Sequence, residues 1–580
     1  MCGICGIFGR VDNALAARML DAIRHRGPDS FNVVDTANAS IAGCRLTIVG
    51  NGTTALPFFD AETGSHVLLN GEIYNYRQLA KDLDLQLERV GDPEALVVSR
   101  VVQHFGLAGV AKLQGMFAFA ILSGERLVLA RDRLGIKPMF FAHVGKELAF
   151  GSEIKAILRH PGCRVELDPE ALDEIAVLGY LASDGRTPFA GIRQVSPGTV
   201  VHFEGGYERE ERYWQAPKAF FSSPGEGLCM DDAAQRLLDV LRSSVRTILG
   251  HDQRSKAFYL SGGVDSSLLA VLATEVLPRV RTFTLADADD SPDLLAARRV
   301  ARAIGAEHHE LRVNLQDYLA ELPAFVRHYE SLVAGGVFDV HGGIAFHILS
   351  RHIAREAQVA CSGEGADELF GGYYWTYTHS LGFADRIKTL LARLGRPEPV
   401  AALVESLFPL PEDAATYRRN LFDFLLQGGL ANYHLWSVDR SCGAFGFEVR
   451  PPYLHDDVVK QALSLPMDLK VHGRGTKMVL KAAALPLFAE FGIGECLTRQ
   501  KEGMPAAVRS IAVELGNLAR ELVPVLHLES HPFGRYISSP IDCMMVDLFC
   551  NIFLANRGDL PAGFDVIEFY RSGAYADMYR

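Results

Sequence analysis

Several features that would mark other classes of protein are absent from this sequence. No run of about eighteen uninterrupted apolar residues occurs, so the sequence predicts no transmembrane helix and no membrane partner. No long basic stretch occurs either, and a formal net charge of -12 argues against nucleic acid as the main ligand. The N-terminal residues lack the basic segment and cleavage site of a secretory signal, so we do not expect secretion.

The ten cysteines are scattered and show no zinc-type spacing. This pattern favours reduced thiols and a cytoplasmic location over a disulfide framework. With 48% hydrophobic and 22% charged residues, the composition is that of a globular protein, and 580 residues are enough for two or three domains.

The order of predicted elements divides the chain. Proline, glycine and serine are concentrated between Gln215 and Leu228, where we place a linker of residues 215–229. In residues 2–214, short strands separated by turns predict packed antiparallel sheets, with helices at Ala14–Ile23, Tyr76–Leu83 and Pro93–Val110. In residues 230–520, strands alternate with helices, which predicts a doubly wound parallel sheet with a helical C-terminal part. Residues 521–580 form an extension with a helix near Ile541–Leu554.

The segment from Ala257 to Ala270 combines an apolar strand, a Ser-Gly-Gly turn and the start of a helix. Glycines let the backbone approach a ligand, and N–H groups at a helix N-terminus attract anions. We interpret the loop as a phosphate or pyrophosphate site, although no Walker-type Gly-Lys-Ser/Thr follows it. Asp265 would be repelled by phosphates without a cation, so we predict that it binds Mg²⁺. For these residues alone, a serine-capped strand-to-helix turn is the alternative.

A second unusual segment, Cys361–Tyr373, carries four glycines and three carboxylates at the end of a predicted strand. A packed core would not hold such residues, and a solvated acidic loop is the alternative to a binding site. Leu369 and Phe370 beside the carboxylates argue against simple exposure.

The chain has a cysteine at position 2. If Met1 is removed, Cys2 holds both a thiol and an α-amino group. The pKa of an α-amino group, about 7.7–8.0, suits abstraction of the thiol proton. One residue would then supply nucleophile and base. The alternative is a small buried apolar cysteine, which is what we expect for Cys5.

Polar residues in turns follow Cys2, a pattern typical of loops that converge on a small-molecule site. They lie in Arg24–Asp29, Arg45–Val49, Asn70–Asn75, at Asp92, and in Gly115–Ala120 and Arg131–Pro138. In this order, they resemble the N-terminal-nucleophile glutaminase domain of glutamine-hydrolysing asparagine synthetases. The resemblance implies a four-layer αββα fold and glutamine as a substrate.

The resemblance also implies roles in the glutaminase. Cys2 would attack the glutamine carboxamide, while Asn70 and the N–H of Gly71 would form the oxyanion hole. A free amino acid needs one fixed cation and one fixed anion. The implied glutamine site consists of Arg45 for the α-carboxylate, Glu72 and Asp92 for the α-ammonium group, and Ile48, Val49 and Asn70.

The second domain resembles the ATP-pyrophosphatase domain of the same synthetases. Besides the two glycine-rich loops, the match extends through Ser291–Leu295, Glu307–Glu310, Phe447–Arg450, Lys477 and Arg499–Glu502. The resemblance implies ATP and Mg²⁺ as cofactors, with Asp265 and Asp367 binding the metal. Lys501 would balance charge at the α-phosphate, and Glu364 would act as base or orienter for ammonia. The implied ATP and pyrophosphate site consists of Leu260, Ser261, Gly262, Gly263, Asp265, Ser266, Ser267, Leu285, Ser362 and Gly363.

Two stretches depart from the family pattern. Tyr329–Ala345 is glycine-rich and lacks the arginine that would meet the aspartate carboxylate, and Pro451–His455 ends on histidine where the family has aspartate. An acceptor without an α-carboxylate would leave a buried arginine unpaired, so the loss of this arginine fits a changed acceptor.

We therefore expect an amidotransferase that adenylates a carboxylic acid, releases pyrophosphate and amidates the acyl group with ammonia from glutamine. The acceptor is either aspartate, which is slightly favoured, or a related acid of a specialised pathway. An intramolecular amide-forming cyclase resembling β-lactam or lasso-peptide synthetases is the second hypothesis, and a non-catalytic regulatory or assembly protein is the third. Partners are thus glutamine, ATP and the acceptor, and a homodimer stays open.

Overall fold

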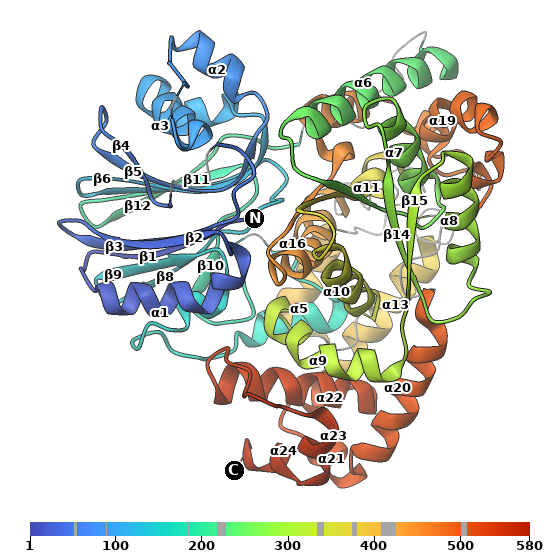
Figure 1. The fold of residues 1–580 in the computed structure, drawn as a ribbon. Helices are drawn as coiled ribbons and strands as arrows, with labels where there is room; N and C mark the ends of the chain where they lie inside the picture. Colours follow the sequence, from blue (N-terminus) through green and yellow to red (C-terminus); the bar gives the residue numbers. More distant parts are fainter. Residues whose placement is uncertain are drawn as a thin grey trace.

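The computed structural model gives an N-terminal domain, a parallel-sheet domain beside it and a helical C-terminal extension (Figure 1). It describes residues 1–50, 55–88, 90–183, 185–216, 228–332, 341–373, 380–407, 425–499 and 507–579. None of the helices in these ranges has both the length and the apolar character needed to cross a membrane.

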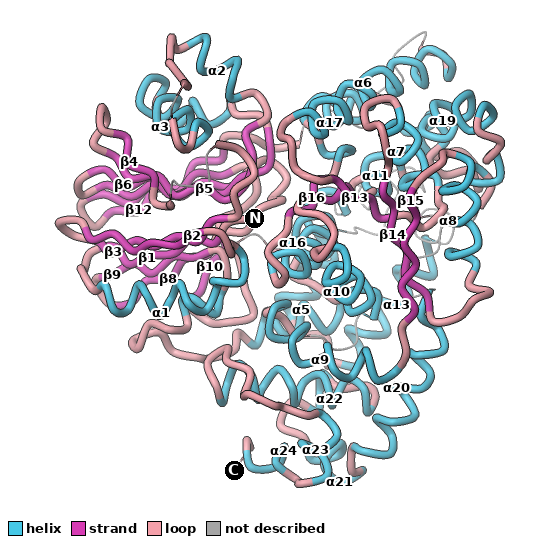
Figure 2. Tube along the Cα trace, viewed as in Figure 1, coloured by secondary structure: helices cyan, strands magenta, loops and turns pink. Residues whose placement is uncertain are grey.

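The N-terminal domain is built on two stacked six-stranded antiparallel sheets (Figure 2). The first has the order β10 (Ile192–Gln194), β8 (Phe140–Val144), β9 (Glu147–Gly151), β1 (Gly3–Phe8), β3 (Ala39–Arg45), β2 (Ser30–Asp35). The second has the order β12 (Tyr207–Arg212), β11 (Thr199–Glu204), β7 (Arg126–Arg131), β6 (Gly115–Ser123), β5 (Ser65–Ile73), β4 (Phe58–Asp60). Helix α1 (Asn13–Ile23) covers the first sheet, and α2 (Tyr76–Asp82) and α3 (Pro93–Phe105) lie over the second. The αββα expectation is confirmed.

The two sheets pack through side chains that face one another. Because successive residues of a strand point to opposite faces, alternate side chains enter the space between the sheets. Ile4 and Ile41 of the first sheet join Ala118 and Leu129 of the second in one buried cluster. Strand β1 has neighbours on both sides, so Cys2, which immediately precedes it, is held by the rigid core.

The second domain contains a five-stranded sheet in which every neighbouring pair is parallel. Its order is β15 (Glu307–Arg312), β14 (Arg281–Ala286), β13 (Lys256–Tyr259), β16 (Val359–Cys361), β17 (Glu448–Arg450). The strand order therefore reverses between β13 and β16, which is the topological switch point where open α/β sheets bind ligands. The two glycine-rich loops follow these two strands, so the doubly wound prediction is confirmed and both loops begin side by side.

Helices alternate with the strands of this domain, as the sequence predicts. They include α6 (Met230–Gly250), α7 (Val264–Thr274), α8 (Pro292–Ala303), α9 (Leu315–Tyr329), α10 (His341–Ile353), α11 (Ala366–Phe370), α16 (Leu435–Gly443), α17 (Asp456–Ser464) and α19 (Met478–Glu490). In the N-terminal domain, the helix expected over Pro93–Val110 was wrong at its end. Gly106, at a φ of +66°, stops α3, and a separate 3₁₀ helix follows at Leu107–Lys112.

The interface between the two domains is rich in buried charge. Nη1 and Nη2 of Arg26 lie 2.9 and 3.0 Å from the carboxylate of Asp439 on α16, and Nη1 also donates to Glu153 at 2.8 Å. Lys137 of the N-terminal domain lies 3.5 Å from Glu448 of β17. Such pairs hold position firmly, because the loss of one partner leaves a buried charge uncompensated.

Helix α20 (Arg509–Leu522) leads into the C-terminal extension, which consists of α21 (Val525–Ser530), α22 (Pro540–Phe549), α23 (Val566–Arg571) and α24 (Ala574–Asp577). Asp547 of α22 is fully buried and accepts hydrogen bonds from Tyr570 at 2.6 Å and Tyr579 at 2.7 Å. Nε2 atoms of His527 and His531 lie 2.9 and 3.0 Å from the same carboxylate. Burial opposes the ionisation of Asp547, but these hydrogen bonds outweigh it and lower its pKa.

With Cys543 nearby, this cluster has the residue types of a zinc site. However, the backbone N–H of Phe533 donates to Nδ1 of His531 at 3.0 Å, so a neutral His531 carries its proton on Nε2. Nε2 then donates to Asp547 and offers no lone pair to a metal. We therefore interpret the cluster as a hydrogen-bond hub that fastens the extension.

Replacing Asp547 with alanine should loosen the C-terminal helices. The buried donors His531 and Tyr570 and the half-buried His527 and Tyr579 lose their acceptor, and each buried donor left unsatisfied costs about 1–3 kcal/mol. We expect the extension to become protease-sensitive, as measured by limited proteolysis with mass spectrometry. E529A, on the exposed surface of α21, should behave like the wild type. Equal protection of D547A and wild type would contradict the hub.

Candidate active sites

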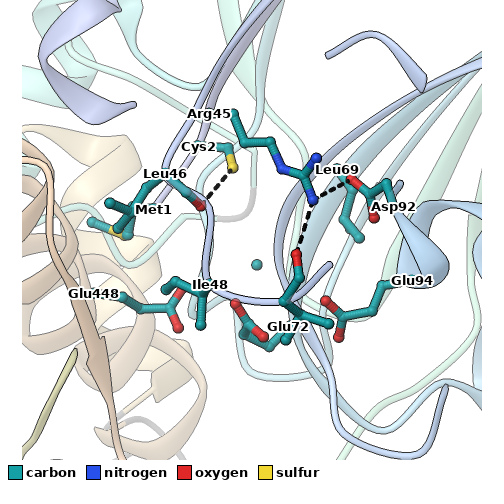
Figure 3. A pocket seen from close by; sticks show the side chains of 12 residues that line it. Met1, Cys2, Arg45, Leu46, Ile48, Leu69, Glu72, Asp92, Glu94 and Glu448 are labelled. Atoms are coloured by element: carbon teal, nitrogen blue, oxygen red, sulfur yellow. Dashed lines mark hydrogen bonds and ion pairs between the residues drawn. The ribbon is translucent and has the colours of Figure 1, made fainter. Parts of the chain in front are cut away.

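A pocket lies beside Cys2, at the start of β1 (Figure 3). It is partly open, and the empty space within it, open solvent included, is about 340 Å³. One lining residue, Glu448, comes from β17 of the second domain. The lining includes all residues predicted to bind glutamine except Asn70, namely Arg45, Ile48, Val49, Glu72 and Asp92.

Asn70 and Gly71 of β5 lie next to Cys2. Oδ1 of Asn70 accepts a hydrogen bond from the backbone N–H of Cys2 at 3.0 Å, and its Nδ2 is buried with no hydrogen-bond partner among the described residues. Gly71 has a φ of +131°, and a Cβ there would lie 1.9 Å from the carbonyl oxygen of Met116. Only glycine fits this position. A preorganised donor beside the thiol is what an oxyanion hole requires.

Arg45 and Asp92 place opposite charges on one wall of the pocket (Figure 3). Nη2 of Arg45 lies 3.2 Å from Oδ2 of Asp92 and donates to the carbonyl of Val49 at 3.0 Å. Asp92 is fixed because its Oδ1 caps α3, accepting from the N–H of Ala95 at 3.0 Å. This wall can therefore pair with both charged groups of an α-amino acid.

The carboxylate of Glu72 lines the pocket and is also held by the second domain. Its Oε2 lies 2.8 Å from Nε2 of His251 and 3.5 Å from Nη2 of Arg450, while Glu94 lies 3.2 Å from the same imidazole nitrogen. Burial disfavours the imidazolium, but hydrogen bonds to Glu72 and Glu94 outweigh it and raise the pKa of His251 to about 9. Burial and the charge of Glu72 raise the pKa of Glu94 to about 7.

Met1 precedes Cys2 and is buried. Burial raises the pKa of the Cys2 thiol above its ordinary value, so the thiol keeps its proton at neutral pH. A peptide nitrogen at Cys2 cannot accept that proton, whereas a free α-amino group can. The predicted nucleophile therefore depends on removal of Met1.

The loop after β13 has a phosphate-binding form. Gly262 has a φ of +72°, and a Cβ there would lie 2.4 Å from the Cβ of Ala296, so the loop requires glycine. Oγ atoms of Ser261 and Ser266 lie 3.2 Å apart, and the N–H of Gly263 donates to Oγ of Ser261 at 3.4 Å. The free N–H groups at the start of α7 add a positive end to the loop.

Two carboxylates from the neighbouring loops converge on one cationic centre. Nζ of Lys477 lies 2.5 Å from Oδ2 of Asp265 and 2.6 Å from Oδ1 of Asp367. These are the two residues predicted to bind Mg²⁺, and carboxylate oxygens that converge on a cation suit that metal. The residues present therefore fit a magnesium ion.

The other predicted ATP-site residues lie around the switch point. Leu260 and Leu285 are buried at the ends of β13 and β14, and a Cβ on Gly363 would lie 3.2 Å from the Cβ of Asp265. Ser362 is buried, and its N–H donates to the carbonyl of Arg450 at 3.3 Å. Ser267 is fully buried, and its hydroxyl contacts Sγ of Cys496 at 3.8 Å, so this hydroxyl is engaged away from the loop. Lys501 lies outside the described residues.

The comparisons with known proteins agree with two sites on two domains. Residues 1–214 match the family model of the glutamine amidotransferase domain, and residues 236–536 match that of asparagine synthase. Asparagine synthetase [glutamine-hydrolyzing] 3 of Bacillus subtilis is 30% identical to this chain, covering 83% of this chain and 84% of the relative. The chain belongs to the glutamine-hydrolysing asparagine synthetase family.

Other relatives are also described as glutamine-hydrolysing asparagine synthetases. Asparagine synthetase [glutamine-hydrolyzing] 1 of Bacillus subtilis is 26% identical over 93% of this chain and 92% of the relative. The asparagine synthetase [glutamine-hydrolyzing] of Gallus gallus is 28% identical over 88% of this chain and 85% of the relative. The chain is thus an asparagine-synthetase-type ligase with a glutamine amidotransferase domain, and this family uses ATP.

Sequence reasoning missed several contacts at these family sites. It included Lys477 and Arg499 in the family match without roles, yet Lys477 joins the two acidic loops and Nη1 of Arg499 donates to the carbonyl of Ser261 at 2.6 Å. His251 gave no signal at all, since nothing in its local sequence indicates the distant carboxylates that it meets. Correlated changes of charge between the two domains in related sequences are the signal that could have identified this contact.

Of the two stretches that depart from the family pattern, the structure describes one fully and the other only in part. His455 replaces an aspartate but still caps α17, because its Nδ1 accepts from the N–H of Asp457 at 3.4 Å. Of the altered stretch Tyr329–Ala345, residues 333–340 lie outside the described residues. The identity of the acceptor is therefore argued from the sequence of this stretch alone.

His251 should give the domain interface a pH dependence. Its pKa is raised to about 9 in the folded protein and is about 6.5 when unfolded, so its stabilisation is fully present below about pH 6.5 and is lost as the pH rises through about 9. The difference in melting temperature between wild type and H251Q should shrink across this range. H472Q, which removes an exposed histidine, should show no such trend. A pH-independent difference for H251Q would contradict the prediction.

Proposed function

We propose that this chain hydrolyses glutamine at Cys2 and uses the ammonia to amidate an adenylated carboxylic acid, giving an amide, AMP, pyrophosphate and glutamate. The observation that supports the proposal is the coexistence of two clusters of the predicted site residues among the described residues. One surrounds Cys2, and the other surrounds the switch point between β13 and β16. A chain that retained only one activity would have no need of both.

In the glutaminase, the α-amino group of the processed Cys2 takes the thiol proton, and the thiolate attacks the carboxamide carbon. The contact between the Cys2 nitrogen and Asn70 Oδ1 supports this arrangement, because it turns Nδ2 of the same amide toward the reaction as an oxyanion donor. Arg45 and Asp92 hold the α-carboxylate and the α-ammonium group. Glu72 adds negative charge to the same pocket. Ammonia leaves and the thioester is hydrolysed to glutamate.

In the synthetase, Asp265 and Asp367 hold Mg²⁺, and Ser261, Gly262 and Gly263 receive the departing pyrophosphate. Mg²⁺ supplies charge neutralisation for the phosphates when bound. Adenylation is needed because a free carboxylate is unreactive toward amines, whereas an acyl-AMP mixed anhydride is reactive. Glu364 acts as the base or orienter for the attacking ammonia. Lys501 balances the negative charge that develops at the α-phosphate.

The acceptor is aspartate or a related carboxylic acid. The names of the relatives favour aspartate, whereas the glycine-rich stretch at Tyr329–Ala345, without the expected arginine, favours a different acid. An intramolecular cyclase would not need a glutaminase, so the intact pocket around Cys2 weighs against that hypothesis.

Replacing Cys2 with alanine separates the two activities. Glutamine-dependent synthesis should fall about 10⁴-fold or more, while ammonia-dependent synthesis should stay within about twofold of wild type. Amide formation is measured with either nitrogen source, and the intact mass of the wild-type protein should lack Met1. C5A, at a buried cysteine, is the control for loss of a thiol. Loss of both activities in C2A would contradict the two-site model.

The acceptor is best identified by ATP–pyrophosphate exchange with a panel of carboxylic acids. We expect exchange with aspartate or a close analogue, since adenylation is reversible before ammonia attacks. D367N should abolish the exchange because the metal loses a ligand. Exchange with other acids but not aspartate would refute the asparagine assignment, and no exchange with any acid would refute adenylation.

A further inference from the structure

A second lysine lies one helical turn after Lys477. Lys477 immediately precedes α19, and the backbone N–H of Lys481 donates to its carbonyl oxygen at 2.8 Å. Residues spaced four apart on a helix are neighbours on one face. Ala484 and Phe488 beside them are fully buried, whereas Leu485 is exposed. Lys481 therefore lies at the border between the buried and the exposed face of α19, and its side chain is half-buried.

Helix geometry directs the side chain of Lys481 toward the two loops at the switch point. Side chains of an α-helix lean toward its N-terminus, which here is the end at Lys477. Nζ of Lys477 lies between the loops, 2.5 Å from Oδ2 of Asp265 and 2.6 Å from Oδ1 of Asp367. Helix α19 also packs against α7, the helix that begins at the Ser-Gly-Gly loop (Figure 1). The ammonium group of Lys481 is thus brought close to that loop.

The charges that act on Lys481 agree with this placement. Burial and the positive charge of Lys477 lower the pKa of the Lys481 ammonium group, while the carboxylate of Asp265 opposes the shift. Because the interaction of two charges weakens with distance, both Lys477 and Asp265 lie near this ammonium group. Lys481 therefore adds a second positive charge beside the loop that is expected to hold phosphates.

This second charge lacks a counter-ion among the described residues. Lys477 shares its charge between two carboxylates, and Arg499 pairs with Asp293. The side chain of Lys481 forms no ion pair and no hydrogen bond in the part of the chain that the structure describes. A half-buried cation that is repelled by a neighbouring lysine is stabilised when an anion binds next to it.

We propose that Lys481 binds the pyrophosphate that leaves ATP at the loop Ser261–Gly263. This inference rests on the proposed function. In adenylation, an oxygen of the acceptor carboxylate bonds to the α-phosphorus, and the bond from that phosphorus to the bridging oxygen breaks. Pyrophosphate leaves with the electron pair. The ammonium group of Lys481 then pairs with the negative charge that develops on the leaving phosphates.

Pyrophosphate suits this position better than an anion with a single charge. Asp265 and Asp367 would neutralise much of the charge of the Mg²⁺ ion that they hold, so the metal alone does not balance the phosphates. The loop and the start of α7 offer N–H groups to the phosphate oxygens. Lys477 is held by the same two carboxylates. Lys481 supplies the additional cation that a polyanion at this loop requires.

The test compares K481Q and K481R in the full-length chain, with inorganic pyrophosphate and Mg²⁺ as the probe. Calorimetry should show that K481Q binds pyrophosphate about tenfold more weakly than the wild type, because one charged hydrogen bond is lost. K481R keeps the charge and should bind within about threefold of wild type. The pyrophosphate concentration that half-saturates ATP–pyrophosphate exchange should rise in K481Q by the same factor as the dissociation constant.

Two readouts should not change. Glutamine hydrolysis and the melting temperature of K481Q should match those of the wild type, because Lys481 has no partner in the described structure that its loss would leave unpaired. K460Q removes an exposed lysine of α17 and is the matched control for loss of one positive charge. It should bind pyrophosphate as the wild type does.

The outcomes separate this inference from the proposed function. Equal affinity of K481Q and wild type for pyrophosphate would overturn the inference, as would the absence of pyrophosphate binding by the wild type. An equal loss of affinity in K481Q and K481R with a lowered melting temperature would also overturn it, because a packing role predicts that pattern. Absence of exchange with every acid in the wild type would instead refute the proposed adenylation, and with it the source of the pyrophosphate.

Discussion

The buried guanidinium of Arg450 links the pocket beside Cys2 to the segment that carries the acidic loop. Its Nε and Nη1 lie 2.9 and 2.6 Å from Glu448 and Asp252, and its Nη2 lies 3.5 Å from Glu72 in the pocket wall. Its own carbonyl accepts the N–H of Ser362 at the start of the acidic loop. Removing one partner of such a buried pair costs about 3–5 kcal/mol. Both candidate sites therefore depend on the relative position of the two domains. The other buried ion pairs of the interface help to hold that position.

The same interface also shapes the pocket beside Cys2. Glu448 of the second domain closes one side of the Cys2 pocket, so the nucleophile lies at the junction of the domains and not on an open surface. At the other site, the loops that follow β13 and β16 meet because the strand order reverses there. Lys477 joins the two loops through Asp265 and Asp367. Under the proposed function, a buried junction between the source and the target of ammonia would limit its protonation and loss.

Much of the fold and much of each site followed from local sequence. The glycines at 262 and 71 are dictated by backbone geometry. The motif around Gly262 predicted a phosphate loop, and the resemblance to the synthetase family implied an oxyanion hole at Gly71. The helix over Pro93–Val110 was misjudged at its end because Gly106 interrupts a hydrophobic pattern that continues past it. The partners of Glu72 could not be predicted, since His251 and Arg450 come from another domain.

By itself, the sequence determined the two-domain order, the cysteine at position 2 and the two glycine-rich loops, because these depend on residue type and short spacing. Tertiary structure alone decided which charges meet. It placed Lys477 between two carboxylates, surrounded Asp547 with hydrogen-bond donors and brought His434 to Glu364. The physical reason is that an electrostatic contact depends on the distance between two charges in space. When the two residues lie far apart in the sequence, the local sequence around either one does not show that distance.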